Sequence, residues 1–233
     1  MSVPAILGAP IPYGEEMKRI TVATLVISAA MLAGCKTTVE TEVNLSDLLN
    51  SSTKQLAGNL LVEVPGCQSH EDSRQPSKLL LDVQQAVPGI FSDAKYEECY
   101  RKGFDSFARF SLPIFLDKDM DGKLASASHI NLISNEKELL SVRVPESIKT
   151  KINNAQKKSP VGKLDMKFAI KVKNDTGKEL PFSAVAVFID QGPHVLSNLT
   201  TKAGKSFLVT LSDVSAKAAV DSGNAMVLMH KSQ

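Results

Sequence analysis

Apolar and polar residues alternate one by one between Leu164 and Val172, in the most regular pattern of the chain. A period of two predicts a β-strand with one buried and one solvent-exposed face. The turn-forming residues 174–177 follow, and residues 180–189 are again rich in apolar side chains. We therefore expect these two segments to pair as an antiparallel hairpin.

A similar alternation over residues 104–116 predicts a second long strand. Asp121-Gly122 follows it and is typical of a hairpin turn, so residues 123–134 are expected to return beside that strand. Further strands are expected at residues 60–64, 139–144, 207–211 and 225–229.

Helical spacing of apolar residues predicts helices between these strands. The clearest begins after Pro76-Ser77 and is expected to stop at Pro88-Gly89. Others are expected near residues 48–56, after Pro145 with Ile148 and Ile152 one turn apart, and from Val214 to Val220 behind a cap at Ser212 or Asp213. Together the pattern predicts an α+β fold of mainly antiparallel strands with interspersed short helices.

The start of the chain carries a different pattern. Lys18 and Arg19 precede an apolar run of about a dozen residues, 20–31, which is too short for the ~20 residues of a membrane-spanning helix. The run ends in Leu32, Ala33, Gly34 and Cys35. An ordinary buried helix with a chance LAGC is the alternative interpretation of this segment.

The LAGC sequence resembles the lipobox of bacterial lipoproteins, which signal peptidase II recognises. The resemblance implies a diacylglyceryl thioether on the Cys35 sulfur, cleavage between Gly34 and Cys35, and acylation, with palmitate for example, of the new amino terminus. A lipid anchor of this kind would hold the protein on the cell membrane, facing the periplasm.

Residues 1–16 do not fit the start of such a leader, because they hold three prolines and no basic residue. We expect Met17 to be the true start and residues 1–16 to be a misassigned extension; a real N-terminal extension is the alternative. Residues 17–34 are then a signal peptide, residues 35–43 a polar lipidated tether, and residues 44–233 a soluble domain. A split near residues 159–160 is a further option.

Three cysteines sharpen this picture. With Cys35 assigned to lipid, Cys67 and Cys99 remain as an even pair, which predicts a disulfide in an oxidising periplasm. Both cysteines adjoin expected turns. Closing this loop would contribute roughly 3–4 kcal/mol in the chain-entropy account. Two separate free thiols are the alternative.

Asp117, Asp119 and Asp121, followed by Gly122, resemble the start of an EF-hand calcium loop. The twelfth position is Ser128 rather than the bidentate Glu, and strands are expected on both sides. The segment 117–122 is therefore either a weak Ca²⁺ site or a solvated turn; no other cofactor is indicated.

Little else in the sequence indicates chemistry. The histidines at 70, 129, 194 and 230 are scattered, and no motif of a serine nucleophile is present, so we expect no enzyme. The net charge of +2 gives no case for nucleic-acid binding. Lysines at 149, 151, 157, 158 and 163 either rest on anionic lipid or form a solvated helix face.

Leader, KTTVETE tether, disulfide pair and β-rich body together resemble small prophage-encoded lipoproteins of enterobacteria, the YfjS/YafY group. That resemblance implies an envelope lipoprotein without known enzymatic activity, attached to the inner membrane. Lys36 favours the outer membrane instead, since Asp after the lipidated Cys is the usual retention signal. The choice of membrane stays open at this point.

Three classes of function follow. The favoured one is a non-catalytic lipoprotein whose periplasmic domain binds or modulates another envelope component, an envelope protein of unknown identity. The others are a structural or envelope-stress-linked lipoprotein and a calcium-dependent module that uses residues 117–122.

Overall fold

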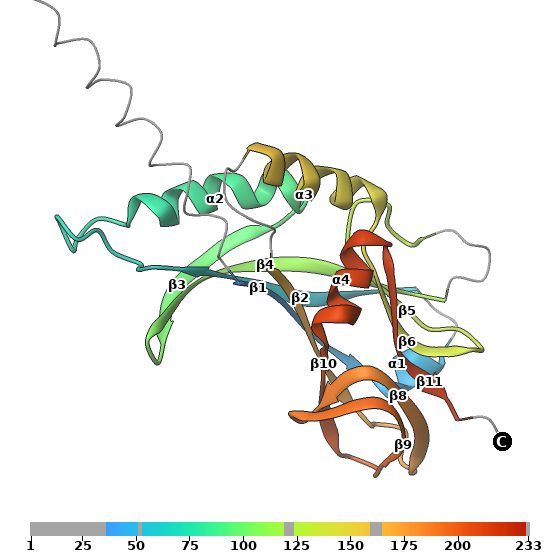
Figure 1. The fold of residues 1–233 in the computed structure, drawn as a ribbon. Helices are drawn as coiled ribbons and strands as arrows, with labels where there is room; N and C mark the ends of the chain where they lie inside the picture. Colours follow the sequence, from blue (N-terminus) through green and yellow to red (C-terminus); the bar gives the residue numbers. More distant parts are fainter. Residues whose placement is uncertain (1–35, 51–52, 119–123, 159–164, 232–233) are drawn as a thin grey trace, which may run out of the picture.

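The computed structural model describes residues 36–50, 53–118, 124–158 and 165–231. Within them the chain forms four helices and one sheet of eleven strands (Figure 1). The strands are β1 (Lys36–Asn44), β2 (Lys54–Val64), β3 (Lys95–Lys102), β4 (Asp105–Asp117), β5 (Asn131–Ile133), β6 (Glu138–Arg143), β7 (Asp165–Lys173), β8 (Leu180–Ile189), β9 (Gly192–Thr201), β10 (Ser206–Leu211) and β11 (Asn224–His230). The helices are α1 (Leu45–Leu49), α2 (Lys78–Ile90), α3 (Glu146–Lys158) and α4 (Asp213–Asp221).

The sheet closes on itself through β8. Its strand order is β10-β7-β1-β2-β4-β5-β6-β11-β8-β9, with an additional pairing between β10 and β8. Val209–Leu211 of β10 pair with residues 187–189, and Leu228–His230 of β11 pair with residues 182–184. Since β9 takes the other edge of β8 along its length, β10 and β11 share one edge. The result is a closed barrel of nine strands.

A bend in β8 separates the two shared segments. Ala186 lies between them and has a φ of 49°, a left-handed conformation that is rare for a residue with a Cβ. Its carbonyl accepts hydrogen bonds from Ser215 Oγ at 2.7 Å and from the Ser212 amide at 3.4 Å. These bonds from the start of α4 hold the backbone of β8 where the strand passes from one partner to the other.

One hydrophobic core fills the molecule. Leu45 and Leu48 of α1 are fully buried, and α1 contacts both β1 and β6. Helix α4 packs against several barrel strands through Ala216 and Ala219. Helices α2 and α3 lie side by side on one side of the sheet (Figure 1), and α2 contacts β2 and β4. The interior therefore holds apolar side chains from helices and strands together.

The α+β class is confirmed in its coarse form, because strands predominate and short helices are interspersed. The sheet is mixed rather than uniformly antiparallel: β1–β7 and β4–β5 are parallel pairs, and the other pairings are antiparallel. Strands from both sides of residues 159–160 share this sheet, with β7 beside β1 and β11 beside β6. The chain therefore does not divide there into two sheets.

The prediction of a polar tether at residues 35–43 is wrong, because residues 36–43 belong to β1. This strand lies between β2 and β7, so both of its edges are paired. Thr37, Val39, Thr41 and Val43 are all buried on one face. Thr41 Oγ1 donates a hydrogen bond to the Ala57 carbonyl at 2.9 Å, which allows a hydroxyl inside the core. Because Thr37 and Thr41 are polar residues in buried positions, the alternation of buried and exposed residues in β1 cannot be recognised from hydrophobicity alone.

Both expected hairpins are wrong as pairings. The strands expected at residues 164–172, 180–189 and 104–116 are confirmed where the structure describes them, as β7, β8 and β4, whereas only Asn131–Ile133 of the return segment 123–134 forms a strand. β7 pairs with β1 and β10, whereas β8 pairs with β9, β10 and β11. Between β7 and β8, the buried Asn174 donates through Nδ2 to the carbonyls of Lys178 and Thr201, at 2.9 and 3.1 Å. The second expected turn, Asp121-Gly122, lies outside the described residues. β5 runs parallel to β4 and cannot be its hairpin partner.

Helix ends and exposed strands also differ from expectation. α1 ends at Leu49, before most of the segment expected to be helical, and α2 continues through Pro88 to Ile90. The sequence pattern does not predict β3 or β9, and Cys99 lies within β3 rather than beside a turn. The side chains of β3 are largely exposed, and those of β9 are mostly exposed or half-buried, so no regular alternation of buried apolar and exposed polar residues marks either strand.

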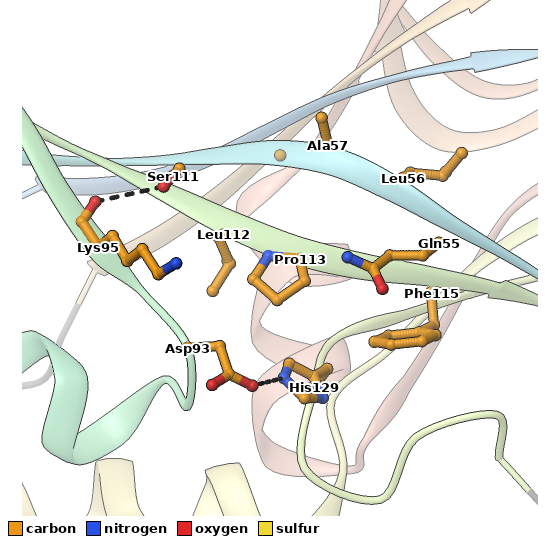
Figure 2. A pocket seen from close by; sticks show the side chains of 11 residues that line it. Gln55, Leu56, Ala57, Asp93, Lys95, Ser111, Leu112, Pro113, Phe115 and His129 are labelled. Atoms are coloured by element: carbon orange, nitrogen blue, oxygen red, sulfur yellow. Dashed lines mark hydrogen bonds and ion pairs between the residues drawn. The ribbon is translucent and has the colours of Figure 1, made fainter.

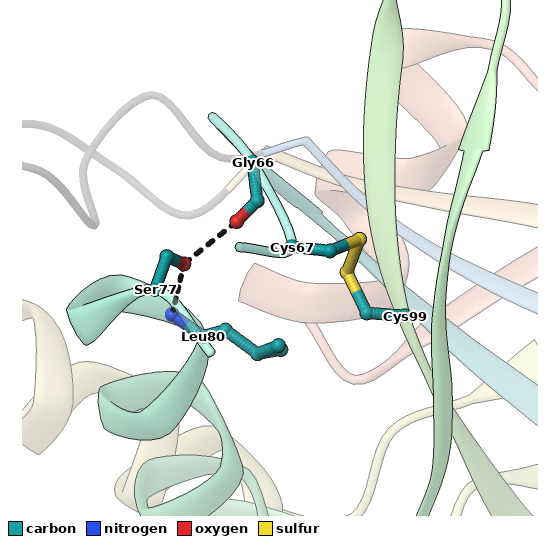
Figure 3. Close-up of a disulfide and its surroundings, with 5 residues drawn as sticks. All are labelled: Gly66, Cys67, Ser77, Leu80 and Cys99. Carbon is teal, nitrogen blue, oxygen red and sulfur yellow. Dashed lines mark hydrogen bonds between the residues drawn. A yellow bond between two sulfur atoms is a disulfide. The ribbon is translucent and has the colours of Figure 1, made fainter. Parts of the chain in front are cut away.

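The structure contains the disulfide between Cys67 and Cys99, with their Cα atoms 5.6 Å apart (Figure 3). It joins the segment after β2 to β3. Beside it, Ser77 Oγ donates to the Gly66 carbonyl at 2.6 Å and accepts from the Leu80 amide at 3.2 Å, so Ser77 is the N-cap of α2. The disulfide and this cap fix the start of α2 against the sheet.

Replacing both cysteines of this disulfide by alanine should lower the free energy of unfolding by roughly 3–4 kcal/mol, because the unfolded chain is no longer restrained. Urea unfolding under oxidising conditions measures the loss. As a control, a reductant should bring the wild type to the midpoint of the variant and leave the variant unchanged. Equal midpoints of variant and oxidised wild type would contradict the expectation.

Candidate functional site

The sheet has a gap beside β4, and this gap borders a hollow of about 510 Å³. On the edge of β4 away from β2, Ser111 is the last residue that pairs with β3, and Phe115 is the first that pairs with β5. Residues 112–114 have no strand partner on that edge among the described residues. Both β3 and β5 begin at this gap, at Lys95 and Asn131.

Pro113 occupies the middle of the gap. The Phe115 amide donates to the Ile130 carbonyl at 3.1 Å, so it faces the edge shared by β3 and β5. Amide groups two residues apart in a strand face the same edge, so position 113 also faces the gap. Proline has no N–H to leave unpaired there, which is why it is tolerated at a sheet edge.

A side-chain pair bridges the gap (Figure 2). Asp93 precedes β3 by two residues, His129 precedes β5 by two, and His129 Nε2 lies 3.1 Å from Asp93 Oδ2. The His129 side chain is only 11% exposed, and its ring centroid is 5.2 Å from that of Phe115. The hollow beside this pair has a volume of about 510 Å³; its lining includes Gln55, Ala57, Lys95, Ser111, Pro113 and Phe115.

Two serines contact the other ring nitrogen of His129. Nδ1 lies 2.6 Å from Ser126 Oγ and 3.2 Å from Ser128 Oγ. The fully buried Asn131 holds this loop, because its Nδ2 donates to the carbonyls of Ser126 and His129, each at 2.8 Å. Its Oδ1 accepts from the Ser126 amide at 3.2 Å. The loop that carries His129 is therefore tied to the first residue of β5.

Ser126, His129 and Asp93 have the order of contacts found in a Ser–His–Asp triad. Acyl transfer also needs N–H donors for the developing oxyanion. Two amides of this loop are already engaged, that of Ser126 with Asn131 and that of Ser128 with Ser126 Oγ at 3.4 Å. We interpret the Asp93–His129 pair, which we name the gap clasp, as a structural link between β3 and β5.

A smaller hollow of about 240 Å³ lies at the end of the barrel covered by α1. The Leu48 carbonyl, near the end of α1, accepts two hydrogen bonds. One comes from the amine of Lys118, and the other comes from the hydroxyl of Ser134 at 2.6 Å. Burial lowers the pKa of the Lys118 amine from its ordinary value. His230 Nε2 lies 2.9 Å from the Asn135 carbonyl on the same side. The bonds from Lys118 and Ser134 to the Leu48 carbonyl hold the end of α1 against the barrel.

The predicted calcium ligands are only partly described. Asp117 ends β4, is 9% exposed, and accepts through Oδ1 from the Lys118 amide at 2.8 Å and from Thr53 Oγ1 at 3.4 Å. Asp119 and Asp121 lie outside the described residues, so the site at 117–122 stays a prediction. Among the described residues, no three His, Cys, Asp or Glu side chains gather as metal ligands do.

The predicted anchor residues, Leu32 to Cys35, also lie outside the described part of the chain. None of the helices described has the length and apolar character needed to cross a bilayer. Within the predicted basic cluster, Lys149 pairs with Glu146 at 2.7 Å and Lys151 Nζ lies 3.3 Å from Ser92 Oγ.

The free edge of β9 differs sharply from that of β3. Both strands pair on one side only within the described sheet, β9 with β8 and β3 with β4. β3 (KYEECYRK) carries five charged residues, a common protection of strand edges. β9 (GPHVLSNLTT) carries no Asp, Glu, Lys or Arg, and its Val195 and Leu196 are 85% and 70% exposed. β9 therefore offers an uncharged, partly apolar strand edge.

The comparison with known families covers nearly the whole described region. A family model with the description "Domain of unknown function (DUF7424)" matches residues 37–233. The chain belongs to this family. No curated protein and no solved structure matches it. The DUF7424 region begins at the second residue of β1, and it includes the gap, the disulfide and β9.

Sequence reasoning missed the main features of this DUF7424 domain. The sequence predicts an ordinary loop histidine at position 129, and Asp93 carries no signal, because 36 residues separate the two. The serines one and three positions before His129 are a local signal that could have found it. The free edge of β9 has no such local signal, since the sequence of β9 does not show which strands lie beside it in the sheet.

Replacing His129 by phenylalanine should lower the free energy of unfolding by about 1–2 kcal/mol, since the ring is kept but its hydrogen bonds to Asp93 and Ser126 are lost. Urea unfolding of the oxidised protein measures the change. His70→Phe, at an exposed loop position, is the matched control and should stay within about 0.5 kcal/mol of the wild type. A His129→Phe variant as stable as this control would show that the gap clasp contributes nothing.

Proposed function

We propose that the chain is a non-catalytic lipoprotein of the bacterial envelope, anchored through lipid on Cys35, whose periplasmic barrel binds another envelope protein along β9. The observation that carries the binding role is the uncharged free edge of β9 with its exposed Val195 and Leu196. The anchor rests on the leader at residues 17–35, and the choice between inner and outer membrane stays open.

The start of the family match supports the anchor. The DUF7424 match begins at Thr37, two residues after Cys35, and Lys36 already belongs to β1. Cleavage between Gly34 and Cys35 would therefore leave the described sheet intact, and the lipidated residue would be joined to β1 without a linker. The disulfide between Cys67 and Cys99 is compatible with an oxidising compartment. The barrel would then lie directly against the membrane.

Strand addition is the mode of binding that β9 supports best. An unpaired strand edge presents backbone N–H and C=O groups that an extended segment of another protein can pair with, while alternate side chains supply specificity. Val195 and Leu196 are consecutive and point to opposite faces of the strand. A segment with apolar side chains on both faces would cover both residues. We therefore expect a partner that contributes an uncharged β-strand.

Replacing Cys35 by serine in the full chain should abolish incorporation of labelled palmitate and block the cleavage that precedes position 35. Metabolic labelling followed by membrane fractionation measures both. Cys67→Ala, which leaves the leader untouched, is the control and should still incorporate palmitate. Unchanged labelling and membrane residence of Cys35→Ser would contradict the anchor.

A photoreactive phenylalanine analogue placed at Val195 of the full chain should crosslink in cells to a distinct envelope protein. The same analogue at Glu97 on the charged edge of β3 is the matched control and should give no such adduct. Adding Leu196→Lys should abolish the adduct from position 195, because a lysine on the edge disfavours pairing. An adduct of twice the mass would show a second copy as the partner, and the absence of any adduct would contradict the binding role.

A further inference from the structure

The hairpin between β3 and β4 presents a fully exposed aromatic side chain. β3 ends at Lys102, β4 begins at Asp105, and only Gly103 and Phe104 lie between them. Gly103 has a φ of +64°, a left-handed conformation that glycine adopts without strain and that permits the tight turn. Phe104 is 100% exposed. A large apolar side chain held at a tip in this way contacts nothing in the described molecule.

The register of the sheet places this tip beyond the start of β1. Thr37 pairs with Val62 of β2, and Val62 pairs with Ala108 of β4. Phe104 lies four residues before Ala108, which at about 3.4 Å per residue puts it about 14 Å past the level of Thr37. The tip therefore extends toward the side from which residue 35 enters β1. In Figure 1 the hairpin projects clear of the rest of the sheet.

Basic residues lie next to the exposed phenylalanine. Arg101 and Lys102 end β3, and both are exposed. Neither forms a salt bridge with another described residue, although Asp105 is the sheet partner of Lys102. Within the same hairpin, Tyr100 of β3 and Phe107 of β4 are sheet partners, and their ring centroids lie 5.9 Å apart. Apolar rings combined with Lys and Arg are typical of segments that rest in a membrane interface.

We propose that the tip of the β3–β4 hairpin is a second membrane contact, in which Phe104 enters the interface of an anionic bilayer while Arg101 and Lys102 face its headgroups. This inference rests on the proposed lipid anchor at Cys35, which would hold the tip within reach of the bilayer. Stable attachment commonly combines acyl chains with a basic patch. The two contacts together would fix the barrel in one orientation, with α1 at the far end of β1.

The chain contains no tryptophan, so a single introduced tryptophan reports its own surroundings. The experiment uses the full lipidated protein carrying Phe104→Trp, reconstituted into vesicles of phosphatidylethanolamine and phosphatidylglycerol that include lipids brominated on their acyl chains. We expect the emission to shift to shorter wavelength and to be quenched. Val195→Trp, at a highly exposed position on β9, is the matched control and should keep the emission of a solvated indole without quenching.

The charge of the bilayer gives an independent readout. Replacing phosphatidylglycerol by phosphatidylcholine, or adding Arg101→Glu and Lys102→Glu, should reduce the quenching at position 104 while the protein stays attached through its lipid. An emission at position 104 as solvated as that at position 195, in protein that floats with the vesicles, would overturn this inference and leave the anchor standing. Protein that carries no lipid and stays in the aqueous fraction would overturn the proposed function itself.

Discussion

Each strand has two hydrogen-bonding edges, and the barrel depends on how β8 divides one of its edges between β10 and β11. Because β9 takes the whole of the other edge, the curled sheet closes only if its two end strands bind successive halves of the same strand. The bend at Ala186 makes this division possible, and the hydroxyl of Ser215 at the start of α4 stabilises it. The segment between β10 and β11 thus also supports the point where the sheet closes.

The interruptions of backbone pairing within the described sheet include the outer edge of β3, the outer edge of β9, and the gap beside Pro113. Charged side chains protect the first, whereas a missing N–H and the gap clasp close the third. Of these three, β9 alone lacks such a device, although unprotected edges invite pairing with other chains. This contrast within one molecule is why we assign binding to β9.

Local patterns in the sequence predicted elements better than pairings. The alternation in β4 and β7 and the cap of α4 at Ser212 are properties of neighbouring residues, and the structure confirms them. Partners in the sheet are chosen by distant residues, so the parallel pair β1–β7 was not visible. β1 itself was missed because buried threonines look polar in a sequence. Of the site, the disulfide followed from counting cysteines, whereas the gap clasp joins residues without any shared local signal.

The placement of β1 between two neighbours bears on how the molecule responds to force. A pull applied at Lys36 along the strand axis acts on the hydrogen bonds to β2 and β7 in shear, because β1 is paired on both sides from its first residues. Many of these bonds must then break together rather than one after another. The start of β1 is thus also a point where the fold resists mechanical extraction.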